Sequence, residues 1–101
     1  MKAYELLLIF NPGLSEDDRG VALERVQSLI SDGGSTLDKV DEWGKRKLAY
    51  EIDKISDGDY VLFEFQAKPA AIAEIDRVLR ITDAVLRFII VQCDEQAKKD
   101  Q

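Results

Sequence analysis

The chain has 101 residues, of which 46% are hydrophobic and 34% are charged, and its formal net charge is −6. This length suffices for one hydrophobic core, so we expect a single soluble domain over residues 1–94 and a polar, frayed tail at 95–101. No run of about 18 apolar residues occurs, which excludes a membrane-spanning helix, and we expect a cytoplasmic protein without a signal peptide.

The first half of the chain predicts a strand, a helix and a long second strand. The apolar run over Tyr4–Phe10 is short and ends before Asn-Pro-Gly, which favours a strand. Ser15 precedes three acidic residues in the manner of a helix N-cap, and apolar residues then recur at helical spacing over about 16–32. Alternation over Thr36–Ile52 predicts a long strand that is bulged or bent at Gly44.

The second half predicts a turn, a strand, a helix and a last strand. The cluster Ser56–Asp59 indicates the turn, and the aromatic and β-branched residues of Tyr60–Ala67 indicate the strand. Pro69 begins a helix that ends by Asp83, and Val85–Cys93 is the last strand. With right-handed crossovers, this order predicts an α+β, ferredoxin-like β-α-β-β-α-β fold, in which a four-stranded antiparallel sheet carries two helices on one face.

The sheet face without helices is expected to carry apolar side chains. Alternation turns one set of residues in each strand toward the helices and leaves a second apolar set on this open face. Because water is a poor neighbour for such a patch, we expect a protein partner or self-association through the face or its edge. The alternative is ordinary surface exposure of apolar residues, which is common. The patch comprises Leu7, Ile9, Leu62, Ile89 and Val91.

Residue types that carry catalysis and metal binding are scarce. The chain has no histidine, and its one cysteine, Cys93, lies in an apolar segment where it is expected to act as a small apolar residue. The acidic run Glu16–Asp18 suits the positive end of a helix dipole better than a metal site. No glycine-rich phosphate loop is present. We therefore expect no enzyme activity, cofactor, metal or small-molecule substrate.

Positive charge is concentrated in the segment from Trp43 to Tyr50. Alternation should point Lys45 and Lys47 to one side and Arg46 to the other, together with Leu48 and Tyr50. The segment is either a solvated strand that resists edge-to-edge aggregation or an RNA contact, with aromatic rings available for stacking on bases. The candidate RNA contacts are Lys2, Lys45, Arg46, Lys47, Arg80 and Arg87. The candidate protein contacts are Leu7, Ile9, Trp43, Leu48, Tyr50, Leu62, Ile89 and Val91.

Four motifs resemble the bacterial small-subunit ribosomal protein six family over about residues 1–94. They are Met1-x-x-Tyr4-Glu5, WGKRKLAYEI at 43–52, Tyr60-Val61-Leu62 and Asp83-Ala84-Val85-x-Arg87. The resemblance implies the same fold and a structural role: binding the central domain of 16S ribosomal RNA together with ribosomal protein eighteen during platform assembly.

The resemblance also assigns residues. Lys2, Lys45, Arg46, Lys47 and Arg87 match basic positions of the family motifs, which makes them candidates for RNA or partner contacts. Glu51 departs from the family, which often has proline there, and it places a negative charge beside the basic segment. The tail is also short, without the long acidic extension of some members.

Two other functions compete with this interpretation. A ligand-sensing or dimeric ferredoxin-like module would use the open face to pair with a second copy, and it would form a homodimer in the absence of RNA. Such a module has no need of a basic strand. An enzyme of the dimeric α/β-barrel type is disfavoured by the missing histidine.

Overall fold

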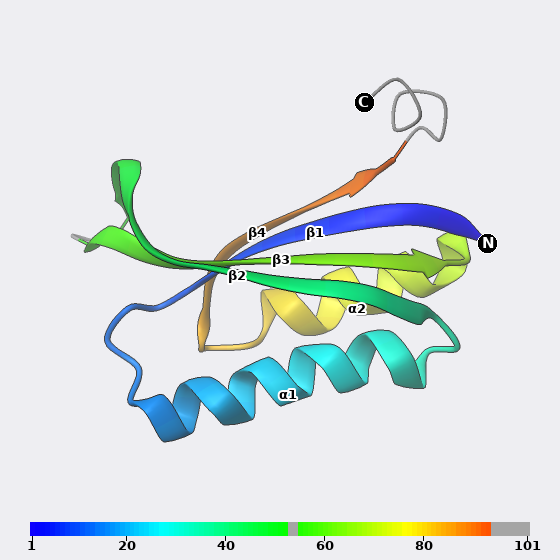
Figure 1. Ribbon diagram of the computed structural model, residues 1–101, viewed down its shortest axis with the longest axis horizontal. Helices are drawn as coiled ribbons and strands as arrows, with labels where there is room; N and C mark the ends of the chain where they lie inside the picture. Colours follow the sequence, from blue (N-terminus) through cyan, green and yellow to red (C-terminus); the bar gives the residue numbers. More distant parts are fainter. Residues whose placement is uncertain (53–54, 94–101) are drawn as a thin grey trace.

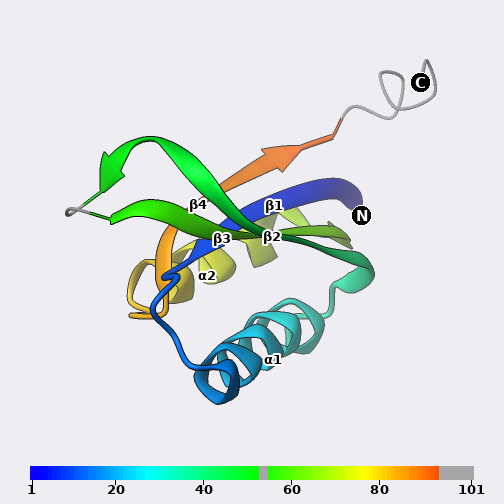
Figure 2. The ribbon, with the colours of Figure 1, turned by 60° about the vertical axis from the view of Figure 1, so that its left-hand side comes forward.

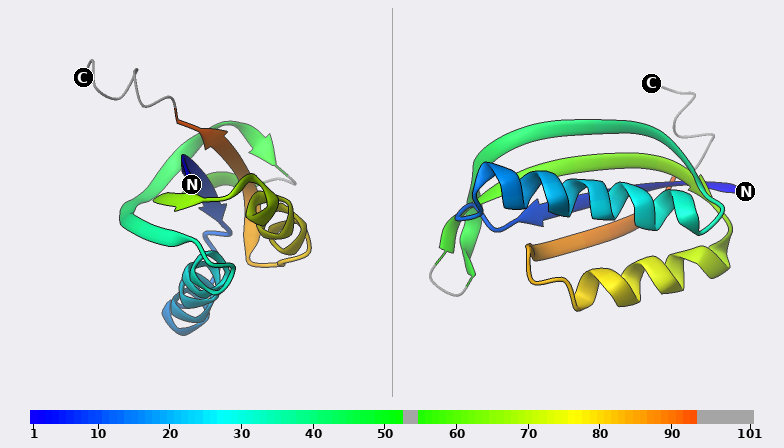
Figure 3. Two further views of the ribbon diagram at one scale, coloured as in Figure 1. Left: turned by 90° about the vertical axis from the view of Figure 1, so that its right-hand side faces the viewer. Right: turned by 90° about the horizontal axis from the view of Figure 1, so that it is seen from below.

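The computed structural model describes residues 1–52 and 55–93, which form one sheet and two helices. The sheet order is β2-β3-β1-β4, and each neighbouring pair is antiparallel. Both helices lie on one side of the sheet (Figure 1 and Figure 3). The predicted fold class is confirmed, while the expected tail at 95–101 lies outside the described residues. The elements are β1 (Lys2–Phe10), α1 (Glu16–Asp32), β2 (Thr36–Ile52), β3 (Ile55–Ala67), α2 (Pro69–Arg80) and β4 (Val85–Gln92).

Helix α1 begins and ends where its sequence signals predict. The side chain of Ser15 accepts a hydrogen bond from the backbone N–H of Asp18 at 3.1 Å, which satisfies one of the free donors of the first turn. The helix ends at Asp32, and Gly34 takes a φ of 83°, a conformation that favours glycine. The helix is thereby fixed in length beneath the sheet.

The core lies between the sheet and the two helices. Alternate residues of β1 and β3 point toward α1 and α2, and the large side chains there are buried, most of them at most 2% exposed. Burying such a side chain contributes about 1.5–3 kcal/mol, so this layer holds the helices to one face and leaves the other face open. The most buried members are Leu6, Leu8, Phe10, Val26, Ile30, Val61, Phe63, Phe65, Ile75 and Leu79.

The predicted turn at Ser56–Asp59 is wrong, because these residues belong to β3. Asp57, Gly58 and Asp59 pair with Lys47, Arg46 and Lys45 in that order, so each aspartate lies opposite a lysine. Only glycine fits at position 58, where β3 passes close to the side chain of Ile9 on β1: a Cβ there would lie 2.3 Å from Cγ2 of Ile9. Opposite charges in register across the two strands, and a glycine with no space for a Cβ, thus favour a strand here over the turn that Asp-Gly usually indicates.

Three other strand ends differ slightly from their predicted positions. β1 begins at Lys2 instead of Tyr4, because it pairs with β3 up to the partner Ala67. β3 begins at Ile55, and β2 and β3 are joined through residues 53–54, which lie outside the described residues. β4 ends at Gln92, although the N–H of Cys93 still donates to the carbonyl of Ala3 at 2.8 Å.

The hairpin of β2 and β3 curls away from the helices at one end of the sheet (Figure 1 and Figure 2). The pairing of the two strands shifts register three times, and one shift falls between Glu42 and Gly44. Gly44 has a φ of 83°, which confirms the predicted bulge. Bulges increase local twist, so this one helps to turn the end of the hairpin over the open face.

Candidate RNA and protein interface

Two aromatic rings and an arginine stack on the open face beside the bulge. The rings of Trp43 and Tyr60 have centroids 6.2 Å apart and an interplanar angle of 10°. The guanidinium carbon of Arg46 lies 5.3 Å from the Trp43 ring centroid, and Trp43 Nε1 donates to Asp41 Oδ2 at 3.3 Å. The bulge places Trp43 and Gly44 together opposite Tyr60. Trp43 therefore faces the open side.

A second arginine and tyrosine meet across the same face. Arg87 on β4 donates from Nη1 to the hydroxyl oxygen of Tyr50, and its guanidinium carbon lies 5.3 Å from the centroid of that ring. β2 and β4 are the two outer strands, so this contact shows that the hairpin reaches over the open face. We call Trp43, Arg46, Tyr50, Tyr60 and Arg87 the aromatic–arginine cluster. The side chains of Trp43 and Tyr50 in this cluster are 38% and 59% exposed, so their rings can stack on unpaired bases.

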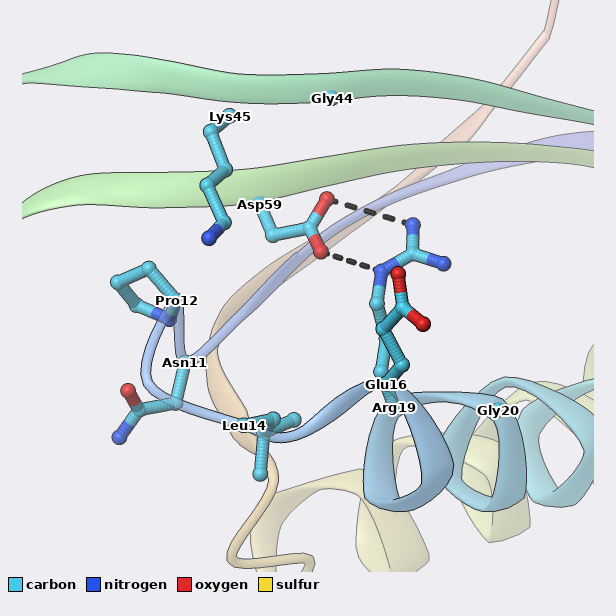
Figure 4. A pocket seen from close by; sticks show the side chains of 9 residues that line it. All are labelled: Asn11, Pro12, Leu14, Glu16, Arg19, Gly20, Gly44, Lys45 and Asp59. Carbon is cyan, nitrogen blue, oxygen red and sulfur yellow. Dashed lines mark hydrogen bonds and ion pairs between the residues drawn. The ribbon is translucent and has the colours of Figure 1, made fainter.

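Lys45 and Lys47 lie on the side of the hairpin away from this cluster. They are opposite Asp59 and Asp57, respectively, and they form no ion pair with any residue that the structure describes. Figure 4 shows Lys45 pointing from β2 toward Pro12, into a hollow of about 480 Å³ that Asp59 and Arg19 also line. The basic triplet therefore divides its charge between two surfaces, as strand alternation predicts.

An ion-pair network beneath the hairpin ties it to α1. Arg19 donates to both carboxylate oxygens of Asp59, from Nε to Oδ2 and from Nη2 to Oδ1, the latter at 3.3 Å. Its Nη1 lies 2.7 Å from Oε1 of Glu42 on β2. The hydrogen bond with Asp59 raises the pKa of Arg19, and partial burial opposes this increase. The network holds Asp59, only 5% exposed, as a paired buried charge.

Sequence reasoning missed this network because Asp59 was assigned to a turn. The available signal was alternation: Asp59 shares the helix-facing side with Val61 and Phe63, so continuing the strand would have placed its carboxylate in the interior. A buried carboxylate needs a cationic partner. Arg19, in the first turns of α1, is a candidate that lies at the same end of the sheet (Figure 4).

Two of the candidate RNA contacts lie far from the cluster. Lys2 is at the opposite end of β1 from Phe10, about 26 Å away at roughly 3.3 Å per residue. Arg80 ends α2 on the helix side, where its Nε donates to Asp76 Oδ2 at 2.9 Å and its guanidinium packs on the ring of Phe88. Of the six candidates, Arg46 and Arg87 lie on the open face, each against an aromatic ring of the cluster.

Apart from Trp43 and Tyr50, the candidate protein contacts form an apolar strip, in which Leu62, Leu7 and Ile89 are neighbours across three strands. Ile89 and Val91 of β4 are 57% and 49% exposed, and Leu7, Leu48 and Leu62 are half-buried. Ile9 was expected on this surface, but it is only 8% exposed. Its side chain packs over Gly58, so it lies beneath the exposed residues and does not form part of the accessible surface.

Two carboxylates meet at the end of the open face away from the cluster, where the exposed Lys39 of β2 lies opposite Glu64. Glu5 on β1 lies directly opposite Glu64 on β3, and Glu5 also pairs with Val91 of β4. The carboxylate of Glu5 accepts a hydrogen bond from Sγ of Cys93 at 3.1 Å, so the thiol is not in a purely apolar setting. The face thus changes from charged through apolar to aromatic and basic along β1.

Residues 1–52 and 55–93 form neither a candidate metal site nor a membrane-spanning helix. No three His, Cys, Asp or Glu side chains of this part are grouped so that they could hold a metal ion. No helix there has the length and apolar character needed to cross a membrane. The acidic first turn of α1 lies where the helix dipole favours negative charge.

Comparison with known proteins identifies the family. The model of the family Ribosomal protein S6 matches residues 3–92. Small ribosomal subunit protein bS6 of Clostridium acetobutylicum is 45% identical over 95 residues, 94% of this chain and 100% of that protein. The bS6 protein of Clostridium beijerinckii is 48% identical over 91 residues, which are 90% of this chain and 96% of that protein.

A solved structure agrees with the sequence matches. The crystal structure of 30S ribosomal protein S6 from Thermotoga maritima superimposes with a TM-score of 0.90 at 31% identity, covering 98% of this chain and 94% of that chain. The chain therefore belongs to the ribosomal protein S6 family, a non-enzymatic family of small ribosomal subunit proteins.

Proposed function

We propose that the chain is a structural component of the small ribosomal subunit that binds the central domain of 16S ribosomal RNA jointly with ribosomal protein eighteen during platform assembly. The observation that carries the proposal is the division of the open face. Its aromatic–arginine cluster suits RNA, whereas the adjoining strip that includes Ile89 and Val91 suits a protein.

The electrostatics of the chain favour joint binding over binding alone. Affinity for RNA depends on basic groups that displace counterions from phosphates. The chain carries a net charge of −6, and two of its three clustered basic residues, Lys45 and Lys47, lie opposite aspartates. A basic partner would supply the remaining positive charge, and the carboxylate of Glu5 would attract it to the open face.

Salt-dependent binding tests this proposal. A central-domain RNA fragment is titrated with this chain alone, with ribosomal protein eighteen alone and with both, at several salt concentrations. We expect tight binding only with both proteins. We also expect this chain to steepen the slope of log K against log salt by only about 1–3, because each phosphate contact contributes roughly 0.7–0.9.

Two outcomes would count against joint binding. Tight binding by this chain alone would show that its acidic surface does not limit RNA affinity. Absence of binding in every combination, together with a homodimer of this chain in light scattering, would instead favour the dimeric module.

The stack of Arg46 on Trp43 predicts which of the clustered basic residues contributes most to binding. We expect Arg46→Ala to weaken the joint complex about fivefold, or ~1 kcal/mol, because it removes a cation from the aromatic–arginine cluster. Lys47→Ala removes the same charge from the other side of the strand and should change affinity less than about twofold. Filter binding with ribosomal protein eighteen present measures both. Equal losses would mean that only net charge matters.

A further inference from the structure

The two outer edges of the sheet differ in how they are protected against pairing with another strand. β2 has eight charged residues among 17, and its pairing shifts register three times. β4 has eight residues and one charge, Arg87, and its pairing with β1 is unbroken from Arg87 to Gln92. Charges and bulges are the usual means of blocking an edge. From Phe88 to Gln92, β4 therefore presents an edge with neither a charge nor a register shift.

The backbone groups that β4 turns outward follow from its register. The N–H of Cys93 donates to the carbonyl of Ala3, so this residue faces β1. Inward and outward residues alternate in an antiparallel pair, so Val91 and Ile89 also bond to β1. No described strand lies beyond β4. The outward N–H and C=O groups therefore belong to Phe88, Ile90 and Gln92.

Apolar side chains flank this edge on both faces of the sheet. Ile89 and Val91 are exposed on the open face. On the helix side, a groove of about 540 Å³ runs between α2 and β4; its lining includes the apolar Ile72, Phe88 and Ile90 and also the ion-paired Asp76 and Arg80. A strand laid along β4 would bond to the outward groups and alternate its own side chains between the groove and the open face.

We propose that the outer edge of β4 accepts an extended segment of a basic protein of the small ribosomal subunit, with apolar residues at alternate positions, as a fifth strand. This inference rests on the proposed function, because the segment belongs to the protein that shares the RNA site. Charge selects this occupant over a second copy, since two chains of net charge −6 repel each other. The edge also adjoins the apolar strip and Glu5, which would attract the same partner.

Amide hydrogen exchange can detect the added strand residue by residue. The 15N-labelled chain is measured by NMR alone and with ribosomal protein eighteen as the probe. We expect the amides of Phe88, Ile90 and Gln92 to exchange rapidly in the free chain and at least about tenfold more slowly in the complex. The inward amides of Ile89 and Val91 are an internal control, because they are already bonded in the free chain.

A proline variant tests the same edge by affinity. Gln92→Pro removes one outward N–H while leaving the bonds to β1, so the variant should fold. We expect it to weaken binding of ribosomal protein eighteen about fivefold or more. Gln92→Ala keeps the N–H and should bind like the parent chain.

Each outcome decides between this inference and others. Binding without selective slowing at Phe88, Ile90 and Gln92 overturns the fifth strand and leaves the proposed function standing. If these amides exchange slowly in the free chain and this protection disappears on dilution, a second copy of the chain occupies the edge. That result also overturns the inference. Failure to bind ribosomal protein eighteen at all overturns the proposed function, and the inference with it.

Discussion

Replacing Asp59 with alanine should lower the free energy of unfolding by about 2–4 kcal/mol. The change leaves the guanidinium of Arg19 beneath the hairpin with Glu42 as its one remaining carboxylate partner. Breaking a fully buried pair costs about 3–5 kcal/mol, and the lower value expected here reflects the 26% exposure of the Arg19 side chain. Urea denaturation followed by circular dichroism measures the loss.

The matched control for this variant is Asp57→Ala. Asp57 lies two residues earlier on the same strand, and it is exposed opposite Lys47. We expect its replacement to change stability by less than about 0.5 kcal/mol. Adding Arg19→Met to Asp59→Ala should restore part of the lost stability, because the uncompensated cation is then gone. Equal effects at Asp57 and Asp59 would refute a specific network.

Gly58→Ala should destabilise the protein by about 1–3 kcal/mol. The new Cβ would lie 2.3 Å from Cγ2 of Ile9 and 3.1 Å from Cδ2 of Leu48. The β-branched Ile9 is buried and stiff about χ1, so it has little freedom to move aside. The hairpin would then have to lift from the open face. Thermal unfolding would show the loss, and near-UV dichroism of Trp43 would report the displacement.

Two further variants separate a steric effect from a general cost of replacing glycine. Gly20→Ala lies within α1, where a Cβ meets no atom within 4 Å, and it should stabilise the protein by about 0.5–1 kcal/mol. Ile9→Leu moves the branch away from the Cβ, so it should reduce the cost of Gly58→Ala when the two are combined. Additive losses would indicate that Ile9 is not the obstacle.

The order and type of the elements could be predicted because their signals are local. The cap at Ser15, the glycines after α1 and the alternation in each strand act within a few residues, and all appear in the structure. The prediction of a turn at Ser56–Asp59 is wrong because the contacts that decide its structure are not local. Its residues pair as a strand with Lys45, Arg46 and Lys47 of β2 and lie against Ile9 of β1, which is distant in the sequence.

The site could be predicted only as far as alternation within one strand allows. Alternation correctly separates Arg46 from Lys45 and Lys47, but it does not place Trp43 on the open face, because that depends on the register shift at Gly44. The contact of Tyr50 with Arg87 requires the curl of the hairpin across the sheet. No local sequence pattern marks Arg19 as part of the ion-pair network, because its role depends on the position of Asp59.

The central position of β1 also affects how the protein is made. β1 is synthesised before the other three strands, yet Leu7 pairs with Leu62 and Ile89, more than half of the chain later. At about 5–20 residues per second, the whole chain takes roughly 5–20 s to synthesise. Through most of that time the apolar β1 has neither neighbour. The complete sheet therefore forms only after β4 has been synthesised, and such non-local pairing favours slow folding.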